Sequence, residues 1–128
     1  MRRRAFISLF PFLSALAWRP ARAANPRRIE LQRSPLAGFQ FYEGERIWSQ
    51  MAAGDPLHLV REPMNPHDER AVAIFWHRFK LGYVPRNENS AIAQMLDRGE
   101  RLGAAVTRLQ KARNPWDRIE FVVWCEVE

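Results

Sequence analysis

A polar segment between two apolar stretches carries the side chains best suited to binding chemistry. Residues 63–70 read PMNPHDER and include the amide of Asn65, the imidazole of His67 and the carboxylate of Asp68. Carboxylate and amide oxygens accept hydrogen bonds from a ligand hydroxyl, and they also bond their own backbone in turns. Because loops on a rigid scaffold often carry function, we expect a binding loop here. A purely turn-forming role for Asn65 and Asp68 is the alternative.

Aromatic and basic residues lie on both sides of this segment. Phe41, Tyr42 and Tyr83 offer ring faces on which an unpaired base can stack, for about 1–3 kcal/mol per base. Backbone phosphates bind Arg and Lys, and four such residues are close in sequence to the loop: Arg61, Arg78, Lys80 and Arg86. Solvated surface charge is the alternative for Arg78 and Lys80. No helix with basic residues is predicted, so the combination favours the end of a single strand over a duplex groove. Packing in the core is the common alternative for any one aromatic ring.

The spacing of apolar residues predicts the elements that must position these groups. Apolar residues that recur at three and four positions predict a helix around 91–96, with Asn87 or Asn89 as N-cap and Gly99 just after its end. Residues 43–54 predict one or two helical turns, or a loop in which Trp48 fills the core. Alternating or β-branched runs predict strands at 36–42, 57–62, 71–76, 81–84, 102–109 and 119–127.

About six strands and one α-helix predict a mainly β fold, a small OB-like or SH3-like β-barrel. The chain length of 128 residues allows one such domain, which we place at 35–128. We expect a flexible arm over 24–34, because that stretch is polar and basic.

The first 23 residues have the pattern of an export signal. Arginines at positions 2–4 precede an apolar stretch over 5–18, and small residues at Ala21 and Ala23 fit a cleavage site. The string RRAFI also resembles a twin-arginine signal. We therefore predict a signal peptide over 1–23, cleaved near Ala23, and an exported protein of the periplasm or cell envelope. An uncleaved anchor or a start codon placed too early are the alternatives.

The charge of the chain is concentrated in this leader. The formal net charge is +6, but five of the 20 Lys and Arg residues lie in 1–23, which holds no acid, so that 15 basic residues face 14 acidic ones after it. A uniformly basic surface is thereby excluded, and any phosphate-binding face must be a local patch. Cys125 is the only cysteine, which excludes an internal disulfide.

The sequence gives little reason to expect a metal, a cofactor or catalysis. The three histidines and Cys125 lack the close paired spacing of structural zinc ligands. The acidic cluster at 67–69 has neither a second carboxylate site nor a nucleophile, which a hydrolase would need. We predict a non-enzymatic protein without a metal or a cofactor.

Two longer strings resemble the HIRAN domain family, a module of DNA-repair helicase-like ATPases and of stand-alone bacterial proteins. REPMNPHDERAVAIFW at 61–76 and KLGYVPR at 80–86 carry the resemblance. It extends upstream to LAGFQFY at 36–42 and downstream through LDRG at 96–99, and covers about residues 35–127.

This resemblance implies a function for the polar loop. Eukaryotic HIRAN domains hold the 3′-hydroxyl end of single-stranded DNA, with an NPxD loop on the terminal nucleotide and aromatic rings around its base. Asn65, His67 and Asp68 match that loop, while Gln40 and Phe41 match an Arg-Tyr pair. A glutamine at position 40 removes a phosphate contact of about 1–3 kcal/mol. By the same match, Tyr83 takes the position of an aromatic residue or histidine beside the pocket, and Arg86 that of a basic residue that follows it in the chain.

We therefore predict a monomeric module that binds single-stranded nucleic acid at its 3′-hydroxyl end and contacts no membrane beyond the leader. An exported envelope module with a protein or glycan partner is the alternative. The predicted contact residues are Gln40, Phe41, Tyr42, Arg61, Asn65, His67, Asp68, Tyr83 and Arg86.

Overall fold

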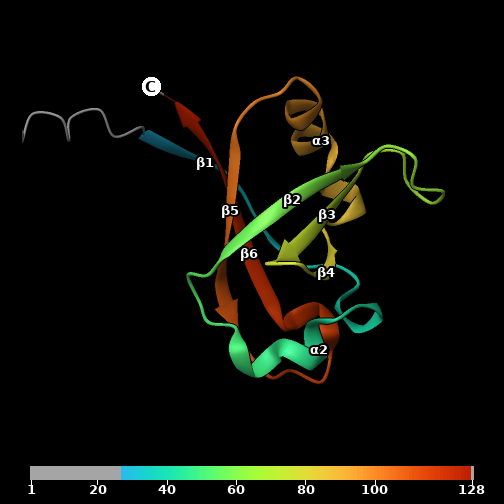
Figure 1. Ribbon diagram of the computed structural model, residues 1–128, viewed down its shortest axis with the longest axis vertical. Coiled ribbons are helices and arrows are strands. Elements are labelled where there is room, and N and C mark those ends of the chain that lie inside the picture. The colour runs from blue at the N-terminus through green and yellow to red at the C-terminus, as the bar shows by residue number, and fades with distance from the viewer. Residues whose placement is uncertain (1–26, 128) are drawn as a thin grey trace, which may run out of the picture.

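The protein was studied as a computed structural model that describes residues 27–127 (Figure 1). The predicted signal peptide over 1–23, its cleavage near Ala23 and the first residues of the predicted arm lie outside the described residues. Within residues 27–127, none of the helices combines the length and apolar character needed to cross a membrane.

Six strands form one sheet in the order β1-β6-β5-β2-β3-β4, and every neighbouring pair is antiparallel. The prediction of a mainly β, six-stranded fold is thereby confirmed. The strands are β1 (Arg27–Pro35), β2 (Pro56–Glu62), β3 (Ala71–Trp76), β4 (Phe79–Tyr83), β5 (Leu102–Leu109) and β6 (Ile119–Val127).

The sheet folds over a single core because its two halves are joined along only a short ladder. β2 pairs with β5 through Pro56 and Leu57 alone, so β2, β3 and β4 diverge from β1, β6 and β5 beyond that point (Figure 1). Both halves contribute fully buried side chains to one cluster, among them Ile74 and Leu81 from one half and Phe121 from the other.

The barrel is not closed by a continuous ladder. β1 and β4 are the edge strands, and within residues 27–127 a single isolated bridge connects the chain after β1 to β4. In it, the amides of Ala37 and Tyr83 each donate to the other residue's carbonyl oxygen at 2.9 Å. This bridge places the segment after β1 directly beside the end of β4.

Short helices connect the strands and cover the ends of the sheet. The predicted helix is α3 (Ser90–Asp97), and Gly99 follows it with a φ of +80°. Asn89 occupies the N-cap position without a side-chain capping bond. The other helical segments are η3 (Phe39–Phe41), α2 (Gly44–Ile47), η4 (Trp48–Gln50), η5 (Arg86–Glu88) and η6 (Pro115–Asp117).

Two predictions about the N-terminal part of the domain were wrong. Residues 27–34 of the expected arm belong to β1, which pairs with β6 from Arg27↔Val127 to Pro35↔Glu120. The expected strand at 36–42 contains only the Ala37 bridge and then turns into η3, because Gly38 adopts a φ of +78° that ends extended structure. β1 escaped detection because most of its side chains are exposed, so ladder bonding rather than an apolar face defines it.

Candidate nucleic-acid interface

The loop between β2 and β3 is folded around the side chain of Asn65. Its Oδ1 accepts hydrogen bonds from the amides of His67 (2.8 Å) and Asp68 (3.2 Å), which is an Asx turn. Its Nδ2 donates to Glu62 Oε1 (3.0 Å) and to the Tyr83 hydroxyl (3.3 Å). All the hydrogen-bonding atoms of the Asn65 amide are therefore used inside the protein, which confirms the turn-forming alternative for this residue.

Asp68 is less fully engaged than Asn65. Its Oδ1 accepts from the amide of Arg70 (2.9 Å), and its Oδ2 accepts from Asn89 Nδ2 (2.7 Å). Each carboxylate oxygen can accept a further hydrogen bond, since it has two lone pairs. Asp68 is half-buried, and Asn89, which holds it from the start of α3, is 1% exposed. The loop thus presents a fixed carboxylate that retains acceptor capacity.

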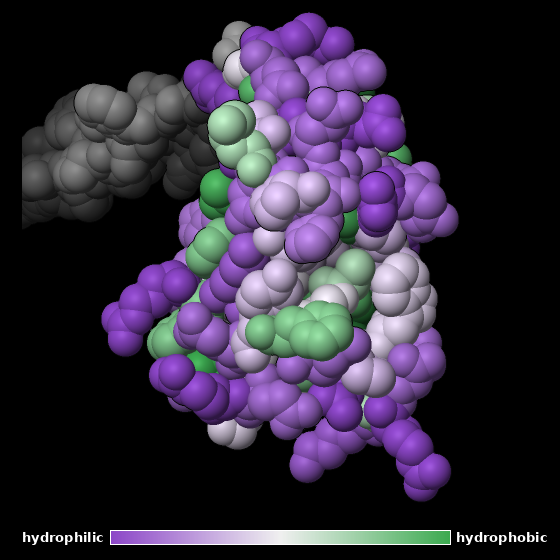
Figure 2. Space-filling model, turned by 90° about the vertical axis from the view of Figure 1, so that its right-hand side faces the viewer, coloured by the Kyte–Doolittle hydropathy of each residue, from purple (hydrophilic) through white to green (hydrophobic). Residues whose placement is uncertain are grey.

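A hollow of about 250 Å³ opens beside this carboxylate, between the loop, η3 and the end of β4. Figure 2 views the side of the molecule toward which the loop projects, and there apolar side chains gather in the middle of a largely polar face. Seven of the nine predicted contact residues line the hollow, namely Phe41, Tyr42, Asn65, His67, Asp68, Tyr83 and Arg86.

Aromatic rings form much of the hollow's lining. Phe41 is 75% exposed, which is unusual for a ring of this size and leaves its face free for stacking. The rings of Tyr42 and Tyr83 meet edge to face with centroids 5.8 Å apart. The hollow therefore combines ring faces with a carboxylate, as the sequence predicted.

The other two predicted contact residues do not line the hollow. Gln40 is exposed within η3. Arg61 donates from Nη1 to the carbonyl oxygen of Ala71 (3.1 Å) and forms an ion pair with Asp97 (3.0 Å). These contacts connect β2 to β3 and to α3, which is a structural role.

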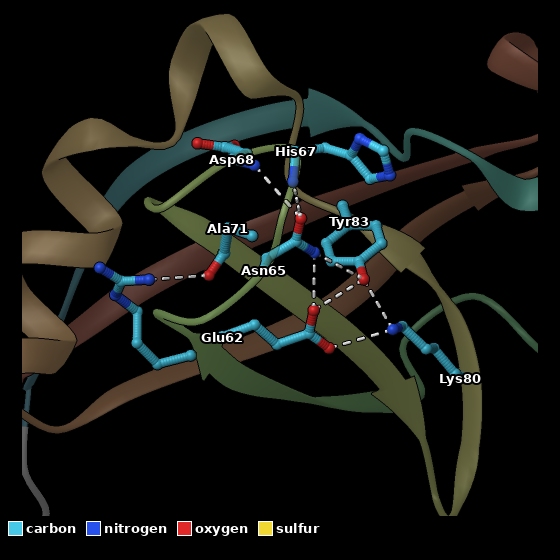
Figure 3. A network of polar contacts seen from close by, with 8 residues as sticks. Glu62, Asn65, His67, Asp68, Ala71, Lys80 and Tyr83 are labelled. Carbon is cyan, nitrogen blue, oxygen red and sulfur yellow. Dashed lines mark hydrogen bonds and ion pairs between the residues drawn. The ribbon is translucent and has the colours of Figure 1, made fainter.

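Behind the hollow, a polar network joins β2, the loop and β4 (Figure 3). Lys80 Nζ donates to the Tyr83 hydroxyl (2.7 Å) and to Glu62 Oε2 (3.0 Å), and the Tyr83 hydroxyl donates to Glu62 Oε1 (2.7 Å). With the amide of Asn65, the four side chains point toward one another. The network fixes both the loop and the Tyr83 ring.

Burial and hydrogen bonding set the ionisation of this network. Desolvation is the largest cause that raises the pKa of Tyr83, to about 12, so the hydroxyl keeps its proton. Burial alone would raise the pKa of Glu62, but the bonds from Asn65, Tyr83 and Lys80 outweigh it and lower that pKa. Burial likewise opposes the charge of Lys80, yet its bonds to Tyr83 and Glu62 raise its pKa.

A second, more polar hollow of about 340 Å³ adjoins the first. The two hollows share Asn65, His67, Asp68 and Arg86, and the second adds Pro66, Glu69 and Arg70. Sequence reasoning did not select Arg70, although this arginine lies in the same polar string. Among residues 27–127, no three His, Cys, Asp or Glu side chains gather as metal ligands would.

A mainly β fold with an aromatic-lined hollow and an acceptor loop defines a small binding module. The HIRAN domain model matches residues 29–128, and the chain belongs to the HIRAN domain family. HIRAN domains are nucleic-acid-binding modules.

Two solved structures share this fold. A protein from Lactobacillus plantarum, known from a crystal structure, is 24% identical with a TM-score of 0.70, over 80% of this chain and 99% of that one. The crystal structure of the HIRAN domain of human HLTF is 18% identical with a TM-score of 0.61, over 79% of this chain and 81% of that one. No curated protein shows significant similarity to the chain.

Proposed function

We propose that the protein binds single-stranded nucleic acid at a free 3′-hydroxyl end and is non-catalytic by itself. The observation that carries this proposal is the hollow itself, in which exposed ring faces adjoin a carboxylate with spare acceptor capacity. A terminal nucleotide offers the complementary groups, a base with two π faces and a hydroxyl that donates.

The chemistry of each group assigns it a role in this proposal. Asp68 accepts from the terminal hydroxyl, and its negative charge disfavours a terminal phosphate at the same place. The terminal base stacks against Phe41 on the exposed side of the hollow. Arg86, which lies in both hollows, is the nearest predicted cation for a backbone phosphate.

The test compares oligonucleotides that differ only in a 3′-hydroxyl or a 3′-phosphate, by fluorescence anisotropy. We expect the wild type to prefer the hydroxyl end, and Asp68→Asn to reduce that preference about tenfold because a charge-assisted hydrogen bond is lost. Asp117→Asn, an exposed carboxylate on η6, is the matched control. Equal binding of both ends by the wild type would refute end recognition.

A second candidate is an exported envelope module that binds a protein or glycan. The near balance of charge after residue 23 and the export pattern of the leader favour it. Under either function we propose an exported, monomeric protein with its signal cleaved near Ala23. Crosslinking in intact cells separates the candidates, since protein or glycan adducts without nucleic acid would support this second one.

A further inference from the structure

Two arginines line the second hollow. Arg70 and Arg86 are both exposed there, and within residues 27–127 neither guanidinium group takes part in an ion pair. Asp68 and Glu69 line the same hollow, so its charge is balanced overall and is positive beside the two guanidinium groups. Such an arrangement suits phosphates at particular places rather than a general attraction to nucleic acid.

The two hollows meet at the carboxylate of Asp68. Asp68 and Arg86 line both hollows, whereas Arg70 lines the second one alone. The amide of Arg70 donates to Asp68 Oδ1 (2.9 Å), which fixes the backbone of Arg70 beside that carboxylate. A strand whose last nucleotide lies at Asp68 can therefore continue directly into the second hollow, where it meets Arg86 before Arg70.

The lining of the second hollow suits a nucleotide backbone rather than a base. The first hollow contains the rings of Phe41, Tyr42 and Tyr83, but among the described residues no Phe, Tyr or Trp lines the second one. Stacking on such a ring is thus confined to the first hollow. Guanidinium groups bind phosphate oxygens through charge-assisted hydrogen bonds, often two at a time. The second hollow therefore offers the groups that the linkages behind a terminal base require.

Another route out of the first hollow runs along β4. Arg46 and Arg78 lie there, with their guanidinium carbons 5.8 and 4.9 Å from the ring centroid of Phe79. Neither arginine lines the first hollow, and Lys80 on the same strand is already held in an ion pair. Figure 3 shows Asp68 and Lys80 at opposite ends of the group of side chains, so the two routes lead in different directions. The route past Asp68 is favoured because there the two hollows adjoin.

We propose that the strand leaves the first hollow across the second one, and that Arg70 binds the phosphate of the second linkage from the 3′ end. Arg86, which lines both hollows, then holds the phosphate of the first linkage. This inference rests on the proposed function, and it adds the direction of the strand and a further contact residue. Because Arg70 meets a phosphate and not a base, it contributes affinity without a sequence preference.

The test is a double-mutant cycle between Arg70 and single phosphates of a 3′-hydroxyl oligodeoxynucleotide, measured by fluorescence anisotropy. A methylphosphonate removes the charge of one phosphate and is placed at the first, second or third linkage from the 3′ end. We expect Arg70→Gln to weaken binding of the unmodified strand about fivefold, the upper range for an exposed ion pair. The same substitution should have no effect on the strand whose second linkage is neutral. Arg70→Lys retains the charge and should keep most of the affinity.

Arg78→Gln, an exposed arginine on the turn between β3 and β4, is the matched control and should leave binding unchanged. A loss in this control that is coupled to one of the linkages would place the strand along β4 and overturn the inference. Thermal unfolding verifies that each variant is folded. The wild-type series needs no variant, because a neutral second linkage that leaves wild-type affinity unchanged also overturns the inference.

The outcomes separate this inference from the proposed function. A wild type that prefers a 3′-hydroxyl over a 3′-phosphate, without coupling between Arg70 and the second linkage, refutes this inference alone. Coupling of Arg70 to the first or the third linkage instead refutes the order of contacts. A wild type that ignores the 3′ group refutes the proposed function, whatever the cycle shows.

Discussion

Phe41 exposes 75% of its surface beside the hollow, whereas Phe39, two positions earlier in the same η3 turn, exposes 1%. Phe39 packs in the core with its ring edge to face against Trp48, at a centroid distance of 5.6 Å. One turn of 3-10 helix thus buries one ring in the core and leaves the other in solvent. A ligand that covers the Phe41 ring would therefore bury apolar surface that folding leaves exposed.

This difference predicts that Phe41→Ala separates binding from folding. Loss of one stacking ring should weaken binding of a 3′-hydroxyl oligonucleotide by about 1–3 kcal/mol, with little change in the free energy of unfolding. Anisotropy titration and urea unfolding measure the two effects. Trp116→Ala, a partly exposed ring on η6, is the control and should leave binding intact. Unchanged affinity in Phe41→Ala would exclude stacking on this ring.

At the scale of elements, the Ala37–Tyr83 bridge is what brings η3 against the end of β4. Gly82 makes this approach possible, because a Cβ built on it would lie 2.2 Å from the Ala37 carbonyl oxygen. The chain therefore needs a glycine at this point for reasons of space.

Gly82→Ala should consequently lower the free energy of unfolding by about 1–3 kcal/mol and open the bridge. Hydrogen exchange at the Ala37 and Tyr83 amides, which are paired in the bridge, should accelerate in the variant. Gly54→Ala is the control for backbone strain alone, since Gly54 also has a positive φ but its added Cβ would meet open space. Equal exchange at both amides in Gly82→Ala and wild type would show that the bridge tolerates a methyl group.

The elements that sequence could predict are those with a buried apolar pattern. The expected strands at 71–76, 102–109 and 119–127 coincide with β3, β5 and β6, because their inward residues fill the core. β1 could not be found in this way, since its two large apolar residues, Ile29 and Leu31, are both exposed and its partner β6 lies about ninety residues away.

The candidate site was predictable to a similar degree. The loop motif identified Asn65 and Asp68, and proximity in sequence identified Tyr83. Lys80 was noted only as a basic residue near the loop, because no spacing in the sequence reveals its contacts with Glu62 on β2 and with the ring of Tyr42. Arg61 was selected for its charge, but in the structure its guanidinium forms an ion pair with Asp97.

For the whole molecule, the near balance of charge limits how strongly electrostatics can drive binding. Beyond residue 23, basic and acidic residues number 15 and 14, and Arg70 and Arg86 are the cations of the second hollow. The binding that we propose therefore relies mainly on stacking and hydrogen bonding.

Binding should accordingly depend weakly on salt. Two phosphate contacts on a single strand predict a slope of log K against log salt of about −1.4. Anisotropy titrations between about 50 and 200 mM salt measure it, and Arg86→Gln should make the slope shallower. A slope several times steeper would mean that general attraction to phosphates dominates.

The bond from Asn89 to Asp68 has a consequence for spectroscopic work on this domain. It links the loop to the first turn of α3, in which the amide of Ala93 donates to the carbonyl oxygen of Asn89. A ligand that displaces the Asp68 carboxylate also displaces Asn89 and the beginning of that helix. Chemical-shift changes at the amides of α3 during a titration therefore report this mechanical linkage as well as direct contact, and a mapped footprint will extend beyond the surface that the ligand covers.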